Sequence, residues 1–308
     1  MSKRIQGYLY LALAMVLVGS TVIASKIIAS GLPPFTATAL RFAIALPIFI
    51  LLMRLKGTEL PKLPFRSWLI LIAQAGAGSV GYTTFLISGL RLSSAADAGV
   101  IIGTLPAVSA ATAVLVLGER PHRFLLMAIA LAAAGVFMIA LTPSNAGDHS
   151  LAGNALIFAA VICEALFILL NKRLQAELQP LALSAIMTGV GLIIAAIPAF
   201  FEAPGRDALS AEVISAIVYY ALVPTVGGFL LWYAGAARVS GSEASLFTAF
   251  APASAVTFAG LFLAEPIGTN QLIGIGCVLA AILSLAFMAP GKVRTVPSIN
   301  GRHLLKEK

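Results

Sequence analysis

The sequence predicts an all-α membrane protein with ten transmembrane helices, arranged as two similar five-helix halves. Three observations predict this fold class. The chain is 60% hydrophobic and only 10% charged, whereas a soluble domain has about 25% charged residues to cover its surface. The apolar residues form long runs between short polar breaks, which is typical of membrane-spanning helices. The pattern of the first half also returns in the second.

Ten runs are long enough to cross a bilayer, because a helix of about 20 apolar residues spans a hydrocarbon core of roughly 30 Å. The runs lack the alternation of barrel strands, so helices are expected. The predicted spans are residues 8–30, 34–54, 67–89, 94–117, 123–141, 151–171, 180–201, 212–236, 241–264 and 268–289. The first run is too long for a signal peptide and is expected to remain as a helix.

The basic residues predict how the chain is oriented. If the N-terminus is cytoplasmic, the segments on that side hold sixteen of the 20 lysines and arginines. Cytoplasmic loops are enriched in these residues, so both termini are expected in the cytoplasm. The net charge of +8 then reflects orientation and not a nucleic-acid partner. Within the spans, Lys26 is expected to extend to the outer interface and Arg41 to pair with an acidic neighbour.

Glycines, prolines and charged residues recur 146 positions apart without a gap. The matching pairs are Gly7 and Gly153, Lys26 and Lys172, Pro34 and Pro180, Gly89 and Gly235, Ser94 and Ser240, Asp97 and Glu243, Pro106 and Pro252, and Glu119 and Glu265. Chance alignment of Leu- and Ala-rich helices explains apolar matches but not these. A duplication is therefore expected, with residues 1–145 as the first half, 146–290 as the second and 291–308 as a cytoplasmic tail.

An odd number of helices in each half implies that the second half enters the membrane upside down. Inverted repeats are typical of secondary transporters, in which two similar halves rock about a site near the bilayer midplane. Two halves of like sequence and opposite orientation provide inward- and outward-facing states of similar energy. The duplication therefore favours a transporter.

Several segments in this order resemble the EamA branch of the drug/metabolite transporter superfamily. They are SAADAG, LPAVSA and LGERP in the first half, SGSEAS, APASA and LAEP in the second, VLVGSTVIASK in the first span and PPFTATALRF at the start of the second span. Within this branch the chain resembles the YddG-type amino acid exporters. The resemblance implies ten helices, cytoplasmic termini and export of amino acids or other metabolites across the bacterial inner membrane. The chain departs from the family pattern at Val18, where a Trp often precedes the glycine of the first helix, and Glu164 occupies the corresponding place in the second half.

A transported solute needs a cavity lined by polar and aromatic groups at mid-membrane depth. The candidates are Ser79, Tyr82, Thr83, Phe85, Thr104, Tyr220, Trp232, Tyr233, Thr248 and Phe250. Each has a structural alternative, because aromatic residues near span ends often form interfacial belts and small hydroxyl residues often serve helix packing. Pro106, Pro224 and Pro252 each remove a backbone hydrogen bond and are candidate hinges, with fixed bends as the alternative.

Glu164 is the strongest candidate for contact with the solute. It lies near the middle of the predicted span 151–171, in the segment AAVICEALFILL. An isolated charge at that depth is costly, and intramembrane carboxylates usually face a cavity or a partner. Our hypothesis is that Glu164 binds an ammonium group of the solute or carries a proton. The alternative is an uncharged carboxyl group bonded to a neighbouring helix.

Other functions find less support. A channel needs a filter of carbonyl or charged rings, and none is apparent. An enzyme needs clustered polar residues at membrane depth, but the three histidines lie in predicted loops or the tail and the two cysteines form no metal pattern. No cofactor or metal is expected, and the lack of a nucleotide motif points to gradient-driven transport.

The expected function is export of small metabolites, with neutral or aromatic amino acids as the first candidates. Organic cations and sugar phosphates are the alternatives, although a phosphate carrier would need several Lys or Arg residues at mid-depth. The expected partners are a small-molecule solute and the lipid bilayer, and the chain is expected to be a monomer or weak dimer.

Overall fold

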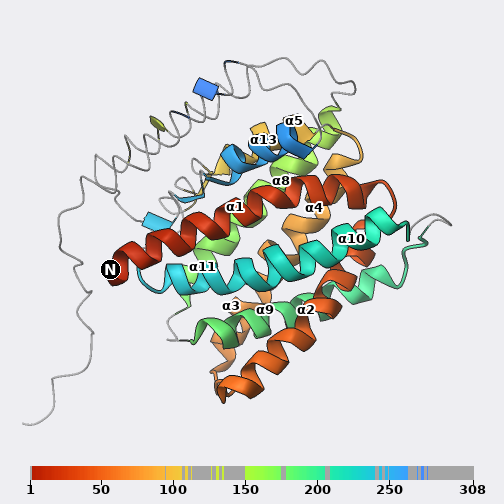
Figure 1. The fold of residues 1–308 in the computed structure, drawn as a ribbon. Coiled ribbons are helices and arrows are strands. Elements are labelled where there is room, and N and C mark those ends of the chain that lie inside the picture. Colours follow the sequence, from red (N-terminus) through yellow and green to blue (C-terminus); the bar gives the residue numbers. More distant parts are fainter. Residues whose placement is uncertain are drawn as a thin grey trace, which may run out of the picture.

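The computed structural model describes residues 2–93, 95–105, 108–109, 112, 126, 130–131, 134, 150–174, 178–204, 209–239, 243–244, 247–248, 250–262, 269, 272–273 and 276. Every regular element among them is a helix (Figure 1). The first half contains α1 (Lys3–Ala29), α2 (Pro34–Lys56), α3 (Phe65–Gln74), η1 (Ala75–Gly81), α4 (Tyr82–Leu90) and α5 (Ala95–Ile102). The second half contains α8 (Leu151–Arg173), α9 (Pro180–Ala199), α10 (Ala211–Tyr220), η2 (Ala221–Gly228), α11 (Phe229–Ala236) and α13 (Phe250–Phe262).

Six helices in the described part of the chain are long and apolar enough to cross a membrane. They are α1, α2, the continuous helix α3–η1–α4, α8, α9 and the continuous helix α10–η2–α11. Each corresponds to a predicted span. The predicted spans 94–117 and 241–264 are described in part, as α5 and α13, while 123–141 and 268–289 lie mostly outside the described residues. The total of ten spans stays a prediction.

Local sequence signals set where the helices begin. The hydroxyls of Ser2, Ser150 and Ser210 each accept a hydrogen bond from the backbone N–H three residues later, at 3.2 to 3.3 Å. Such side-chain caps satisfy amide groups that have no partner inside the helix. Helices α2 and α9 instead begin with Pro34 and Pro180, whose missing N–H costs nothing in the first turn.

The third helix of each half carries the same irregularity. Both helices widen into a π-helix, in η1 and η2, and then return to α-helix. They begin at residues 65 and 211, enter the π-helix at 75 and 221, and end at 90 and 236. Each of these pairs is 146 residues apart. Because π-helices are rare, their shared position indicates a common origin of the two halves.

The corresponding helices of the two halves run in opposite directions. The end of α1 and the start of α8 meet beside the same loop, since Lys26 Nζ donates to the Ser93 carbonyl at 2.8 Å and Ser93 Oγ donates to Asn154 Oδ1 at 2.9 Å. The start of α2 meets the end of α9, where Glu202 accepts hydrogen bonds from the Phe35 and Thr36 amides at 3.1 and 2.6 Å. Lys26 Nζ also donates to the Leu90 carbonyl at 2.9 Å, so it caps carbonyls at and just after the end of α4. Its position at the outer interface stays a prediction.

Two close glycine contacts between the halves are equivalent under the internal repeat. A β-carbon on Gly235 of α11 would lie 3.0 Å from the Gly7 carbonyl oxygen on α1. A β-carbon on Gly89 of α4 would lie 2.9 Å from the Gly153 carbonyl oxygen on α8. Glycine is needed at both contacts, because any side chain would separate the helices. We call these two pairs the reciprocal glycine contacts.

Candidate solute-binding cavity

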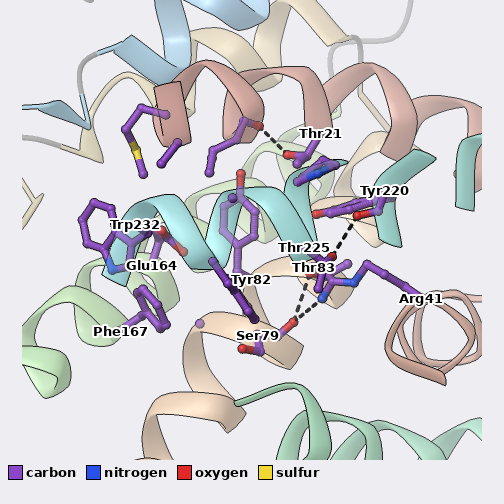
Figure 2. A pocket seen from close by; sticks show the side chains of 17 residues that line it. Thr21, Arg41, Ser79, Tyr82, Thr83, Glu164, Phe167, Tyr220, Thr225 and Trp232 are labelled. Carbon is purple, nitrogen blue, oxygen red and sulfur yellow. Dashed lines mark hydrogen bonds between the residues drawn. The ribbon is translucent and has the colours of Figure 1, made fainter. Parts of the chain in front are cut away.

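A cavity of about 550 Å³, its open mouth included, lies between the two halves (Figure 2). The lining residues are Ala14, Met15, Val18, Thr21, Arg41, Gly78, Ser79, Tyr82, Thr83, Glu164, Phe167, Tyr220, Pro224, Thr225, Gly228, Phe229 and Trp232. They come from α1, α2, η1 and α4 in one half and from α8, α10, η2 and α11 in the other. Both halves therefore build the cavity.

Both π-helices border this cavity. Helix η1 contributes Gly78 and Ser79, and η2 contributes Pro224, Thr225 and Gly228. A π-turn departs from the regular i−4 hydrogen-bond ladder, and such turns often occur at functional sites. The Ser79 carbonyl, for example, accepts hydrogen bonds from two side chains, Arg41 at 2.9 Å and Thr83 at 3.1 Å. The duplicated irregularity thus borders the cavity from both halves, and in η1 it presents a backbone carbonyl that two side chains use.

Arg41 places a guanidinium group at the cavity wall. The side chain is only 6% exposed, and its guanidinium carbon lies 4.2 Å from the ring centroid of Phe42 and 4.5 Å from that of Tyr220. Nη2 donates to the Ser79 carbonyl. No described carboxylate pairs with Arg41, so the predicted acidic partner is wrong for the described part of the chain. Aromatic rings surround the charge instead.

Glu164 places a carboxyl group on the other side of the cavity. It is 7% exposed and projects from α8. It forms no hydrogen bond or ion pair with any residue that the structure describes. In Figure 2 it lies beside Phe167 and Trp232, with Tyr82 between it and Arg41. The alternative of a carboxyl group bonded to a neighbouring helix finds no partner among the described residues.

An aromatic wall adjoins Glu164. The ring centroids of Phe167 and Trp232 are 6.2 Å apart, with the planes tilted by 39°. Tyr233 lies behind this wall, 6.1 Å from Phe167 and 5.9 Å from Phe229 between ring centroids. These separations are typical of favourable aromatic pairs. The wall offers an apolar aromatic surface on the side of the cavity that holds the carboxyl group.

The structure brings together about half of the residues that the sequence singled out for solute contact. Ser79, Tyr82, Thr83, Glu164, Tyr220 and Trp232 line the cavity, as does the hinge candidate Pro224. Their part in solute binding stays a prediction, as does the hinge.

The other candidates lie away from this cavity. Phe85 is 37% exposed, and Tyr233 supports the aromatic wall from behind. The Thr104 hydroxyl donates to the Ile101 carbonyl at 2.7 Å. Thr248 is fully buried, and Phe250 stacks on Phe247 with centroids 6.0 Å apart. Pro252 is buried within α13, and Pro106 lies outside the described residues.

Sequence reasoning pointed to Thr225 but missed several other lining residues, among them Thr21, Arg41, Phe167 and Phe229. Two of them had a usable signal. Phe167 follows Glu164 by three residues, so a helix places both on one face. Arg41 is a charge inside a predicted span, which by itself marks a functional candidate.

Long apolar helices around a cavity that both halves line, with charged groups in a mostly apolar wall, are typical of a polytopic membrane protein of the transporter class. The chain belongs to the EamA-like transporter family, whose sequence profile matches residues 5–141 and again residues 151–287. The two matches begin and end 146 residues apart, which is the offset of the internal repeat. The resemblance seen in the sequence is therefore confirmed.

Curated relatives carry transporter names. The chain is 34% identical over 285 residues to the uncharacterized transporter YetK of Bacillus subtilis, covering 91% of this chain and 86% of that protein. It is 24% identical over 287 residues to a protein of Salmonella typhimurium named a probable amino-acid metabolite efflux pump, covering 89% and 92%. A solved structure titled "Crystal structure of protein" matches with a TM-score of 0.73 at 18% identity, covering 92% of this chain and 96% of that chain. That structure supports the fold alone.

Proposed function

We propose that this chain is a secondary transporter that exports neutral or aromatic amino acids across the bacterial inner membrane. In this proposal both termini are cytoplasmic, the second half is inverted in the membrane, and the working unit is a monomer or weak dimer. The observation that carries the proposal is Glu164, a buried carboxyl group that faces the central cavity and has no partner among the described residues.

Alternating access follows from the arrangement of the halves. Corresponding helices run in opposite directions, and the two halves meet at the cavity. If one half rocks against the other, the cavity opens to one side and then the other, with similar energies because the halves are alike. The absence of a nucleotide motif from the sequence agrees with a process driven by a solute or proton gradient.

The chemistry of the cavity supports an amino acid as the solute. Glu164 can hold an ammonium group, and the Phe167–Trp232 wall can cover an apolar or aromatic side chain. The name of the Salmonella relative points in the same direction. Organic cations are a second candidate, because a carboxyl group beside aromatic rings also suits them. Sugar phosphates find less support, since Arg41 is the one Lys or Arg among the lining residues.

Counterflow in proteoliposomes tests the proposal. The purified protein is reconstituted with an unlabelled solute inside, and uptake of labelled solute is followed with and without a pH gradient. The panel contains leucine, phenylalanine, tryptophan and one aromatic organic cation, with empty liposomes as the control. Saturable exchange of amino acids is expected.

The outcomes separate the candidates. Exchange of the cation without any amino acid would replace the amino acid proposal with the cation exporter. If no solute moves faster than in empty liposomes, the proposed substrates are wrong. Acceleration by the pH gradient would favour proton coupling over exchange driven by solute alone.

A further inference from the structure

We infer that Arg41 binds a carboxylate group of the solute, so that the cavity recognises zwitterions through Arg41 on one side and Glu164 on the other. This inference rests on the proposed function, because it names what distinguishes an amino acid from a simple cation at the same site. It assigns an anion subsite to the region around Arg41, Ser79 and Tyr220.

Arg41 has no carboxylate beside it among the described residues. The side chain is 6% exposed within a membrane-spanning helix, and a buried guanidinium group is costly unless it is paired and hydrogen-bonded. Of its three nitrogens, only Nη2 donates to a described residue, and its acceptor is the neutral Ser79 carbonyl. Nε is buried without an acceptor in the described part of the chain. An anion arriving in the cavity would supply the missing partner.

The Arg41 side chain is held in place by its neighbours. Phe42 and Tyr220 lie 4.2 and 4.5 Å from the guanidinium carbon, and the Ser79 carbonyl fixes one edge of the group. A planar guanidinium group that is already ordered loses little freedom when it binds a carboxylate with two parallel hydrogen bonds. The ring contacts thus orient the donors before the solute arrives.

A further donor lies next to Arg41. The Ser79 hydroxyl is buried, belongs to a residue that lines the cavity and has no hydrogen-bond partner among the described residues, while the carbonyl of the same residue accepts from Arg41 Nη2. A hydroxyl group next to a guanidinium group is suited to bind an oxygen of a carboxylate.

Arg41 and Glu164 are not paired with each other. They line one cavity but form no ion pair, and Figure 2 places them on opposite sides of Tyr82. Each is therefore available to a solute group of opposite charge.

The wild-type protein offers the first test, through competition against labelled phenylalanine in proteoliposomes. The competitors are phenylalanine, phenylalaninamide, phenylethylamine and 3-phenylpropionate, which keep the ring and vary the charged groups. The amide and the amine should compete at least about tenfold less well than phenylalanine, because a hydrogen-bonded charge pair is lost. Equal competition by phenylalaninamide would overturn the inference and leave the amino acid transporter intact. Absence of any amino acid exchange would overturn both.

Variants of Arg41 offer the second test. Arg41→Gln should raise the apparent KM for phenylalanine at least about tenfold. It should also make phenylalanine and phenylalaninamide compete about equally well. Arg54→Gln is the matched control, because Arg54 is an exposed arginine on the same helix. Size-exclusion and melting profiles establish that each variant is folded. A folded Arg41→Gln protein that still prefers the acid to the amide would overturn the inference. If Arg41→Gln does not fold, the comparison of acid and amide on the wild type decides.

Discussion

The hydroxyl of Tyr8 on α1 donates a 2.5 Å hydrogen bond to Oε1 of Glu243. Arg4 joins the same carboxylate through an ion pair and also donates to the Tyr8 hydroxyl at 2.7 Å. The three side chains connect the first turns of the chain to a residue 235 positions after Tyr8. Glu243 corresponds to Asp97 in the other half, so one of the repeated acidic residues links the start of α1 to the second half.

Tyr8→Phe should lower the melting temperature of the protein in detergent. Loss of a hydrogen bond to a carboxylate costs about 1.5 to 3 kcal/mol, and less where water reaches the group. Tyr10→Phe is the control, because the Tyr10 hydroxyl makes no hydrogen bond with the described residues. Equal melting temperatures for the two variants would contradict a stabilising role for the Tyr8–Glu243 contact.

Gly235→Ala should destabilise the bundle more than Gly76→Ala. The new methyl group at position 235 would come within 2.7 Å of Leu11 Cγ and 3.0 Å of the Gly7 carbonyl oxygen. Such overpacking typically costs about 1 to 3 kcal/mol. At Gly76 the nearest atom is 3.9 Å away, so the methyl group fits. The melting temperatures in detergent measure the difference. The prediction fails if Gly235→Ala has the same melting temperature as the wild type.

Glu164→Gln should abolish the response of exchange to a pH gradient. Glutamine keeps the size of the side chain but can neither carry a proton nor attract an ammonium group. Glu212→Gln removes a carboxylate from an exposed position on α10 and is the matched control. Initial rates of counterflow at several imposed gradients provide the measurement. A Glu164→Gln protein with unchanged rates and an unchanged pH response would rule out both roles of the carboxylate.

Trp232→Ala should weaken the preference for aromatic over small neutral amino acids. The ring forms half of the wall beside Glu164, and an aromatic pair contributes about 0.5 to 1.5 kcal/mol, or roughly two- to tenfold in affinity. The ratio of apparent KM values for tryptophan and alanine measures this preference. Tyr219→Ala is the control, since Tyr219 is a partly exposed aromatic residue outside the lining. If this KM ratio is unchanged in Trp232→Ala, the Phe167–Trp232 wall does not contact the substrate side chain.

The membrane helices could be predicted because lipid imposes their length and polarity. The predicted span 34–54 compares with α2 at Pro34–Lys56, and 180–201 with α9 at Pro180–Ala199. The π-helices could not be predicted, since AGAGSVG and ALVPTVGG read as ordinary small-residue helix. Both π-helices border the cavity, which is a tertiary feature that neither segment reveals by itself.

The site could be predicted only where a residue type was itself unusual. Glu164 stood out because a carboxyl group is costly in the membrane, and it does face the cavity. Phe85 and Phe167 are the same kind of residue, but Phe85 is exposed and Phe167 lines the cavity. Which face of a helix points inward depends on its neighbours. The error at Arg41 has the same origin, because Tyr220 approaches it from a helix about 180 residues later in the chain.

The reciprocal glycine contacts have a consequence for the history of the chain. Gly7 of the first half contacts Gly235 of the second, and the equivalent Gly153 of the second half contacts Gly89 of the first. Each half therefore carries both of the surfaces that form this contact. A protein that consists of one half alone, inserted into the membrane in both orientations, would already possess both sides of this interface. An ancestral gene encoding one half could therefore have worked as an antiparallel homodimer before fusion, and the fusion would have freed Val18 and Glu164 to diverge at equivalent positions.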